Sequence, residues 1–212
     1  MPLKRVTIDD NGTFVEALDR YGTDDTFYQI ARVCTGKGFH EQTDDDEKRG
    51  EFIARLIRQG HLRPFEFAGI VVGIRCPIFV ERQLRTYRKP DMERSLRMCE
   101  PIEKIEGVRI QSHYDYERVN AINRYKKEIE NGAKREEARR ILTLDTLTEV
   151  ASYYTIRSLF HVFDERLHPA AQSETRRYVT ALLEIARELF PQTIKAYEES
   201  RDDTNRTGTL QG

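Results

Sequence analysis

Residues 67–97 read FAGIVVGIRCPIFVERQLRTYRKPDMERSLR. The apolar run from Phe67 to Cys76 is rich in β-branched residues and is short enough to form one buried strand. Pro77 stands where a helix begins, and apolar and basic side chains follow at helical spacings until Pro90. We therefore expect a central strand followed by a helix that carries the arginines.

Helices and short strands are predicted on both sides of this segment. Alternating apolar and polar residues around Asn11-Gly12 indicate two short strands near the N-terminus. Helical spacing follows the capping residues 23–25, and again follows the acidic stretch 43–47 up to Gly60. The remaining predictions are a strand-like region over 101–115, helices over 115–129, 135–142, 156–167 and 170–189, and a strand over 144–154. We expect one domain over residues 1–200 and a disordered tail over 201–212.

The overall charge excludes some classes of binding protein. The chain has 212 residues, and its 35 basic and 36 acidic side chains nearly cancel. This balance argues against general binding of nucleic acid or of a membrane surface through positive charge. The three cysteines have no CxxC spacing, and no apolar run approaches the roughly 18 residues of a membrane helix. We expect a cytoplasmic protein.

Positive charge is concentrated between Arg82 and Arg97. This segment holds six basic residues and two acids in an otherwise balanced chain. Guanidinium groups offer fixed charge and forked donors, so Arg85, Arg88 and Arg97 suit a phosphate or pyrophosphate. A solvated helix face with i,i+3 and i,i+4 ion pairs explains the same pattern equally well. The segment alone therefore leaves both interpretations open.

Other segments of the chain decide between these interpretations. GHLRPFE at 60–66 precedes the central strand, PIFVERQ follows it at 77–83, and AAQSE stands at 170–174. In this order, over most of the chain, they resemble the flavin-dependent thymidylate synthases. The fold that this resemblance implies is α+β, a twisted sheet flanked by helices, assembled into homotetramers with active sites shared between subunits.

The chain departs from the signature of that family, which is R-H-R-x-x-S-x-N-E-x-S-x-R. Thr86-Tyr87-Arg88 replaces its first three residues, and the next part is one residue shorter and has Met92 before the glutamate. Glu93, Ser95 and Arg97 then resume the pattern. In the family the first part contacts the flavin and the second part binds the uridylate. The resemblance therefore implies a retained uridylate end and a remodelled flavin end.

The resemblance also implies roles for particular residues. His61, Arg88 and Arg157 are expected to contact the flavin, and Arg85 or Lys89 to replace the lost charge. Without the resemblance, His61 reads as a helix-terminal histidine, and Arg157 as a partner in a surface salt bridge. We predict neither a metal site nor a side chain acting as a catalytic nucleophile. The residues implied for the nucleotide are Gln83, Glu93, Ser95, Arg97, Arg139 and Arg166.

The implied reaction is methylation at carbon 5 of a uridine monophosphate. The cofactors would be FAD, NADPH and methylenetetrahydrofolate. We favour UMP as substrate, because Thr86-Tyr87 and the shortened loop reshape the pocket, and a ribose hydroxyl needs both space and a partner. That branch resembles enzymes of polyoxin-type nucleoside-antibiotic biosynthesis. The alternatives are an ordinary thymidylate synthase acting on dUMP, and a degenerate member that only binds nucleotide or RNA.

Overall fold

A five-stranded antiparallel sheet lies at the centre of the molecule. The computed structural model describes residues 1–36, 45–102 and 113–207. Within them the strand order is β1-β2-β3-β5-β4. The strands are β1 (Lys4–Thr7), β2 (Phe14–Tyr21), β3 (Gly69–Pro77), β4 (Asp91–Glu93) and β5 (Leu147–Thr155).

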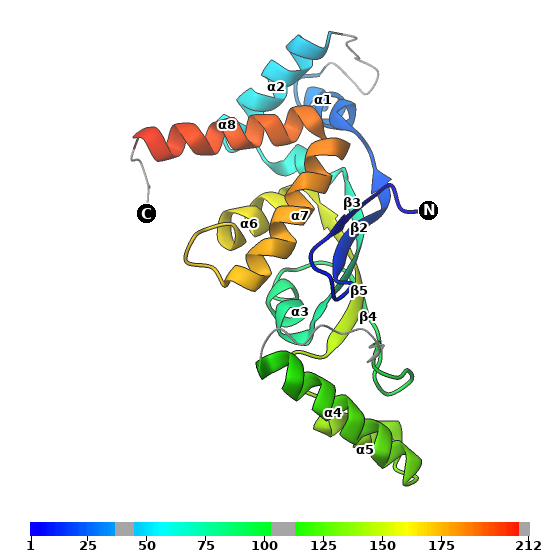
Figure 1. Cartoon of the computed structure of the whole chain (residues 1–212). Coiled ribbons are helices and arrows are strands. Elements are labelled where there is room, and N and C mark those ends of the chain that lie inside the picture. The colour runs from blue at the N-terminus through cyan, green and yellow to red at the C-terminus, as the bar shows by residue number, and fades with distance from the viewer. Residues whose placement is uncertain (37–44, 103–112, 208–212) are drawn as a thin grey trace.

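Helices flank this sheet, so the predicted α+β fold class is confirmed. Figure 1 shows that α3, α6 and α7 lie against one face of the sheet, while α1 and α2 lie at one end. The helices are α1 (Asp24–Val33), α2 (Asp46–Arg58), η1 (Arg63–Glu66), α3 (Ile78–Leu84), α4 (His113–Glu130), α5 (Arg135–Ala138), η2 (Arg139–Ile141), α6 (Ile156–Arg166), α7 (Ser173–Leu189) and α8 (Pro191–Thr207).

The predicted N-terminal strands and the predicted central strand form where expected. β1 and β2 pair around the Asn11-Gly12 turn, where Gly12 has a φ of 80°. β3 is the middle strand of the sheet, which confirms the prediction of a central strand. It approaches β5 so closely that a Cβ on Gly69 would lie 2.2 Å from the carbonyl oxygen of Tyr154. Only glycine allows that pairing.

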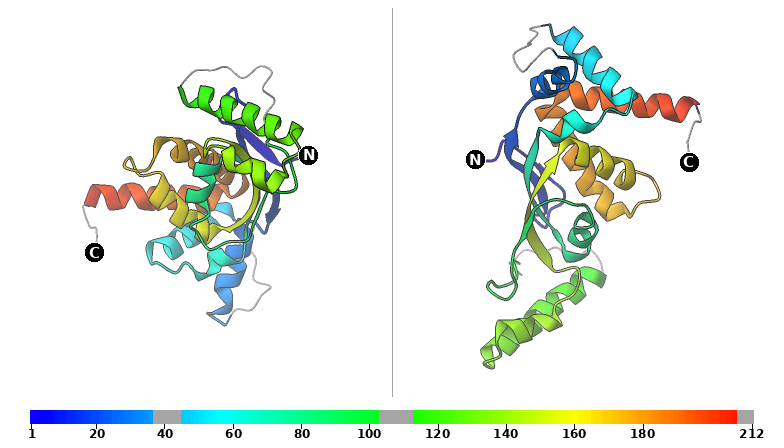
Figure 2. Two further views of the ribbon diagram at one scale, coloured as in Figure 1. Left: turned by 90° about the horizontal axis from the view of Figure 1, so that it is seen from below. Right: turned by 180° about the vertical axis from the view of Figure 1, so that it is seen from behind.

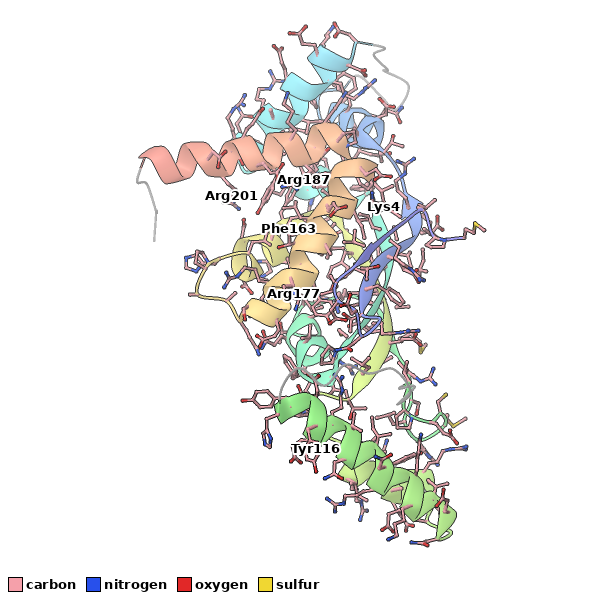
Figure 3. All side chains as sticks on the ribbon, viewed as in Figure 1. Lys4, Tyr116, Phe163, Arg177, Arg187 and Arg201 are labelled. Atoms are coloured by element: carbon pink, nitrogen blue, oxygen red, sulfur yellow. The ribbon has the colours of Figure 1, made fainter. Side chains whose placement is uncertain are left out.

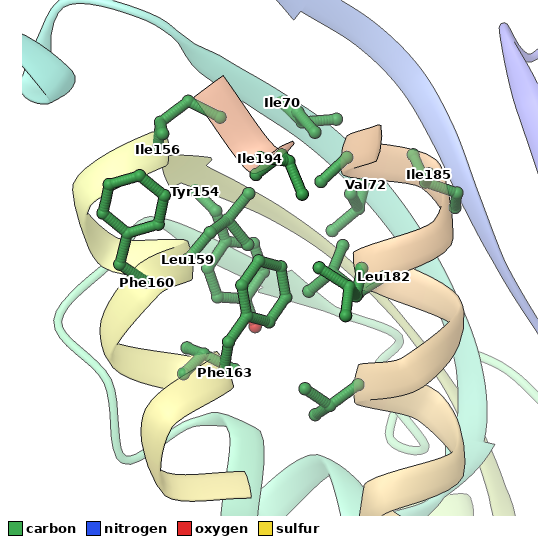
Figure 4. Packing of buried hydrophobic residues seen from close by; sticks show 14 of the residues in the cluster. Ile70, Val72, Tyr154, Ile156, Leu159, Phe160, Phe163, Leu182, Ile185 and Ile194 are labelled. Atoms are coloured by element: carbon green, nitrogen blue, oxygen red, sulfur yellow. The ribbon is translucent and has the colours of Figure 1, made fainter. Parts of the chain in front are cut away.

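The hydrophobic core fills the space between the sheet and its helices. Figure 4 shows side chains from β3, α6 and α7 meeting there, among them Val72, Leu159, Phe163 and Leu182. All four are at most 1% exposed. Burial of each such side chain contributes about 1.5–3 kcal/mol to the free energy of folding. The core therefore fixes α6, whose outer surface reaches the site described below.

Helix α8 is attached to the core through its first turn. Asp24, at the start of α1, accepts hydrogen bonds from the backbone N–H of Gln192 at 3.2 Å and of Thr193 at 3.1 Å. Asp24 is 8% exposed, and burial raises the pKa of its carboxyl group. Further along, the Tyr197 ring stacks on Phe160 at 4.6 Å between centroids. These contacts hold α8 over α6.

Helices α4 and α5 form an arm that extends away from the sheet, as Figures 1 and 2 show. Its own small core contains Ile122, Tyr125 and Ala138, each at most 3% exposed. Arg118 lies in the same arm and pairs with Asp115 at 3.3 Å. The arm thus has internal packing that is separate from the main core.

Several sequence predictions are corrected at the ends of elements. The arginine-bearing helix ends at Leu84, well before Pro90, because the Thr86 hydroxyl bonds the Gln83 carbonyl and Tyr87 turns into the core. The helix predicted over 135–142 divides into α5 and the 3-10 turn η2. Helix α8 continues through Thr207, and the domain bounds, with one domain over 1–200 and a tail over 201–212, remain a prediction. Most of the strand-like region over 101–115 lies outside the described residues.

Candidate functional site

A large cleft opens where the loop after α3 meets α6, α8 and the end of α2. Its volume is about 1490 Å³, more than the roughly 300–1,000 Å³ of most small-molecule sites. Three of the predicted flavin residues line it, namely Arg88, Lys89 and Arg157. The lining also includes Arg58, Gly60, Leu62, Glu66, Thr86, Tyr87, Phe160, His161, Asp164, Tyr197 and Arg201.

The wall formed by Tyr87 is held by α6. The Tyr87 side chain is 7% exposed, and its hydroxyl donates to Glu165 at 2.8 Å. Burial, together with that hydrogen bond to a carboxylate, raises the pKa of Tyr87 to about 12. Glu165 also lies 3.3 Å from Nε2 of His161, one turn earlier on α6. Tyr87 is therefore a fixed neutral wall with an imidazole beside it.

The predicted flavin cations differ in how freely they face the cleft. Arg88 is exposed on the loop. Arg157 is half-exposed and pairs with Glu66 across the cleft. Lys89 is only 3% exposed, pairs with Asp91 at 2.5 Å, and lies 5.2 Å from the centre of the Tyr154 ring. Of these three cations, Arg88 and Arg157 are thus accessible from the cleft, whereas the Lys89 side chain is buried in the cleft wall.

His61 stands at the edge of the same cleft. Its imidazole is exposed, and its neighbours Gly60 and Leu62 both line the cavity. Its backbone N–H donates to the Leu56 carbonyl at the end of α2. The helix-terminal interpretation therefore describes the backbone of His61, and its exposed side chain is not among the residues that line the cleft.

Sequence reasoning missed Arg201, His161 and Arg58 as cleft residues. Arg201 projects from α8, as Figure 3 shows, and pairs with Asp164, which also accepts from the Tyr197 hydroxyl at 2.5 Å. It falls in the stretch predicted to be disordered, so no helical signal pointed to it. His161 lies one turn after Arg157 on α6, a spacing that the sequence itself contains.

Arg85 does not line the cleft. Its Nε donates to Glu81 at 2.6 Å, and its Nη2 donates to Glu93. Glu93 in turn accepts from the Thr148 hydroxyl at 3.1 Å. Of the two cations expected to replace the lost charge of the signature, Lys89 lines the cleft, whereas Arg85 is engaged by two carboxylates.

The residues predicted for the nucleotide form separate groups in one chain. Gln83 accepts from Thr175 at 3.1 Å and also bonds Gln172 at the start of α7. Arg166 donates to Thr86 at 3.4 Å, close to the Gln83 carbonyl that Thr86 itself contacts. Thr86 lines the cleft, and its bonds place Gln83 and Arg166 beside that part of it, although neither of the two is a lining residue. Glu93 belongs instead to the cluster around Arg85.

A third group lies near the arm. Arg97 is 69% exposed and pairs with Glu136 of α5 at 3.3 Å. Arg139 is exposed in η2. Ser95 is exposed, and its carbonyl accepts from the backbone N–H of Met98 and of Cys99. One chain therefore does not gather all six predicted nucleotide residues around a single point.

Two further observations concern only the part of the chain that the structure describes. There, no group of three or more His, Cys, Asp or Glu side chains is arranged to hold a metal ion. No helix among residues 1–36, 45–102 and 113–207 is long and apolar enough to cross a membrane.

Comparison with known proteins identifies the family. The model of the family described as thymidylate synthase complementing protein, Thy1, matches residues 17–192. The chain belongs to the flavin-dependent thymidylate synthase family. It is 30% identical over 208 residues to a flavin-dependent thymidylate synthase of Thermus thermophilus, covering 88% of this chain and 76% of that one. It is also 30% identical over 209 residues to that of Thermotoga neapolitana, covering 91% and 94%. The predictions of the family and of an enzyme are confirmed.

A solved structure has the same fold. This is the UMP/dUMP methylase PolB from Streptomyces cacaoi bound with 5-Br dUMP, with a TM-score of 0.75 and 22% sequence identity. The alignment covers 87% of this chain and 94% of that one. The thymidylate synthase-like α+β fold is thus observed directly, while the altered signature marks a divergent member of the family.

The cleft fits a flavin dinucleotide in size and in charge. Its volume of about 1490 Å³ is large enough for a ligand of that size. The exposed guanidinium groups of Arg88 and Arg157 match a pyrophosphate. Phe160, Tyr87 and Tyr197 supply apolar and aromatic surface in the same cleft. The cleft therefore offers guanidinium groups and aromatic surface suited to FAD, and the assignments of His61, Arg88, Lys89 and Arg157 remain predictions.

Proposed function

We propose that this protein methylates carbon 5 of a uridine monophosphate with FAD, using methylenetetrahydrofolate as the carbon donor and NADPH as the reductant. The observation that carries the proposal is the cleft lined by Arg88, Lys89 and Arg157 in a chain of this family. Family membership supports a flavin, whereas NADPH and the folate come from the resemblance alone.

The flavin, when bound, supplies the redox chemistry that turns the transferred carbon into a methyl group. The chain's own residues would bind and orient. Arg88 and Arg157 would neutralise the pyrophosphate of the cofactor, and Tyr87 would form a wall that excludes water. Arg97, Arg139 and Arg166 would bind the phosphate and the uracil carbonyls of the substrate.

UMP is the proposed preferred substrate. Thr86 and Tyr87 stand where the family has Arg and His, and Tyr87 is withdrawn into the core by Glu165. A smaller hydroxyl side chain, Thr86, therefore stands beside Arg166 at the end of the cleft. A related fold has been solved with 5-Br UMP as well as with 5-Br dUMP, which supports testing both nucleotides. An ordinary thymidylate synthase acting on dUMP is the alternative, and it has the support of the relatives' names.

We also propose that copies of the chain assemble, as a tetramer, to complete each nucleotide site. The reason is the separation of Arg97 and Arg139, near the arm, from Gln83 and Arg166, at the cleft. Neighbouring copies in a closed assembly can bring such groups together. A fully active monomer would contradict this. The cytoplasmic location and a role in nucleoside-antibiotic biosynthesis also stay predictions.

One experiment tests the main proposal. The purified protein is examined for flavin absorbance, reconstituted with FAD, and supplied with methylenetetrahydrofolate, NADPH and either UMP or dUMP. The methylated nucleotide is then measured. We expect a larger kcat/KM for UMP, and a strong preference for dUMP would overturn that choice. A colourless protein that cannot take up FAD would favour the degenerate nucleotide-binding alternative.

A further inference from the structure

Arg85 bridges two carboxylates that come from different elements. Its Nε donates to Glu81 of α3 at 2.6 Å, and its Nη2 donates to Glu93 of β4. Glu93 is held on its other oxygen by the Thr148 hydroxyl at 3.1 Å. Both Glu93 oxygens are therefore oriented, while the side chain keeps 29% of its surface exposed.

Arg85 supplies the positive charge between two neighbouring carboxylates, Glu81 and Glu93. Glu81 is 3% exposed, and burial raises the pKa of its carboxyl group, whereas the hydrogen bond from Arg85 lowers it and the nearby Glu93 raises it. Two carboxylates this close repel each other, and the guanidinium between them offsets that repulsion. Asp91 of β4, Cys76 of β3 and Tyr154 of β5 also interact electrostatically with Glu81.

The geometry points to a role for Arg85 that the sequence did not predict. We propose that Arg85 is a positioning residue, which holds the Glu93 carboxylate in the orientation that accepts a hydrogen bond from the uridylate. This inference rests on the proposed function, since it concerns the same nucleotide. Arg85 therefore acts through Glu93 and does not contact the flavin.

Removing the arginine has a consequence for nucleotide binding. Without the guanidinium, Glu93 loses the hydrogen bond on one oxygen and keeps the Thr148 hydroxyl on the other. Its carboxylate is then less well oriented for the nucleotide, so the KM for UMP should change more than kcat or the thermal unfolding midpoint. A purely structural role for Arg85 would lower the amount of folded enzyme and leave the KM in place.

The test compares Arg85→Gln and Arg85→Lys with a matched control, Arg187→Gln. Arg187 also bonds a carboxylate, Glu198, through Nε and Nη2, but at the packing of α7 against α8 (Figure 3). For each protein we would measure the KM for UMP, kcat, and the thermal unfolding midpoint. The flavin-loaded protein is used, and FAD affinity is recorded separately.

We expect Arg85→Gln to raise the KM for UMP roughly tenfold or more, since a charged hydrogen bond to the nucleotide is misaligned. Its kcat and its thermal unfolding midpoint should change much less. Arg85→Lys should recover part of the affinity for UMP, because a charged donor is kept while the forked geometry of the guanidinium is lost. Arg187→Gln should match the wild type in KM and kcat, and the FAD affinity of all three variants should be unchanged.

Three outcomes would overturn the inference. One is an Arg85→Gln enzyme with the wild-type KM for UMP. The second is a weaker affinity of Arg85→Gln for FAD with an unchanged KM for UMP, which would return Arg85 to the flavin. If Arg85→Gln does not fold, Arg85→Lys carries the test, and a wild-type KM for UMP in that variant would be the third. Failure of the proposed function differs from all three, because the wild type itself would then methylate neither UMP nor dUMP.

Discussion

If Arg157 binds the flavin pyrophosphate as proposed, Glu66 competes with the cofactor for it, and this competition leads to a quantitative prediction. The two side chains form an ion pair in the cleft and are 47% and 50% exposed, respectively. An exposed pair of this kind is worth about 0–1 kcal/mol. A hydrogen bond from a guanidinium to a phosphate contributes about 1.5–3 kcal/mol. Arg157 should therefore leave Glu66 when the pyrophosphate binds.

The two partners should consequently have opposite effects on FAD affinity. Arg157→Gln removes the phosphate contact and should raise the Kd roughly 10–100-fold, at 1.4 kcal/mol for each tenfold change. Glu66→Gln releases Arg157 from its partner and should lower the Kd by up to about fivefold. In the double variant the gain from Glu66→Gln should disappear, because no arginine remains to be released.

Quenching of flavin fluorescence, titrated at low and at high salt, measures these Kd values directly. The low-salt difference between Arg157→Gln and the wild type should shrink as salt rises, since exposed charges are screened. Arg187→Gln is the control, because it removes a comparably exposed arginine outside the cleft. An Arg157→Gln protein that binds FAD within twofold of the wild type would refute the assignment of Arg157 to the cofactor.

The remaining predictions concern stability, measured by denaturant unfolding. Asp24→Ala should cost about 2–4 kcal/mol, because α8 loses its cap and buried donors lose their acceptor. The pKa of Asp24 is raised above 3.8 in the folded state. The wild type should therefore gain stability relative to Asp24→Asn as the pH falls through that pKa. A difference in stability between the two proteins that does not change with pH would contradict this prediction. Lys89→Met should cost about 3–5 kcal/mol by leaving Asp91 unpaired, and Asp91→Leu in the same chain should recover much of the loss. Phe163→Ala should cost about 3–5 kcal/mol, against under about 0.5 for the exposed Phe67→Ala; similar losses would mean that Phe163 is not a core anchor.

Local patterns in the sequence were enough to predict most of the fold. The β-branched run that became β3 and the helical spacing that became α6 and α7 each reflect burial on one side of an element. Strand β4 was missed because Asp91–Glu93 is short and polar, and only its pairing with β5 defines it. The early end of α3 at Leu84 also depends on tertiary contacts, since Tyr87 is drawn into the core by Glu165.

The candidate site was predictable only in part, for a similar reason. Resemblance led to Arg88 and Arg157, which do line the cleft. It could not show that Lys89 is buried on Asp91, nor that Arg85 is held by two carboxylates, because those partners are defined by folding. Arg201 carried no signal at all, since its role depends on where α8 crosses α6.

The loop from Arg85 to Asp91 has a consequence for how this family diverges. Consecutive residues of the loop serve different parts of the site, since Arg85 holds Glu93 whereas Thr86 lines the cleft. An insertion or deletion here shifts both parts at once, so such a change is retained only if compensating substitutions arise on both sides. Natural variation in this loop should therefore occur in linked blocks, with the residues at positions 81, 85 and 93 inherited together.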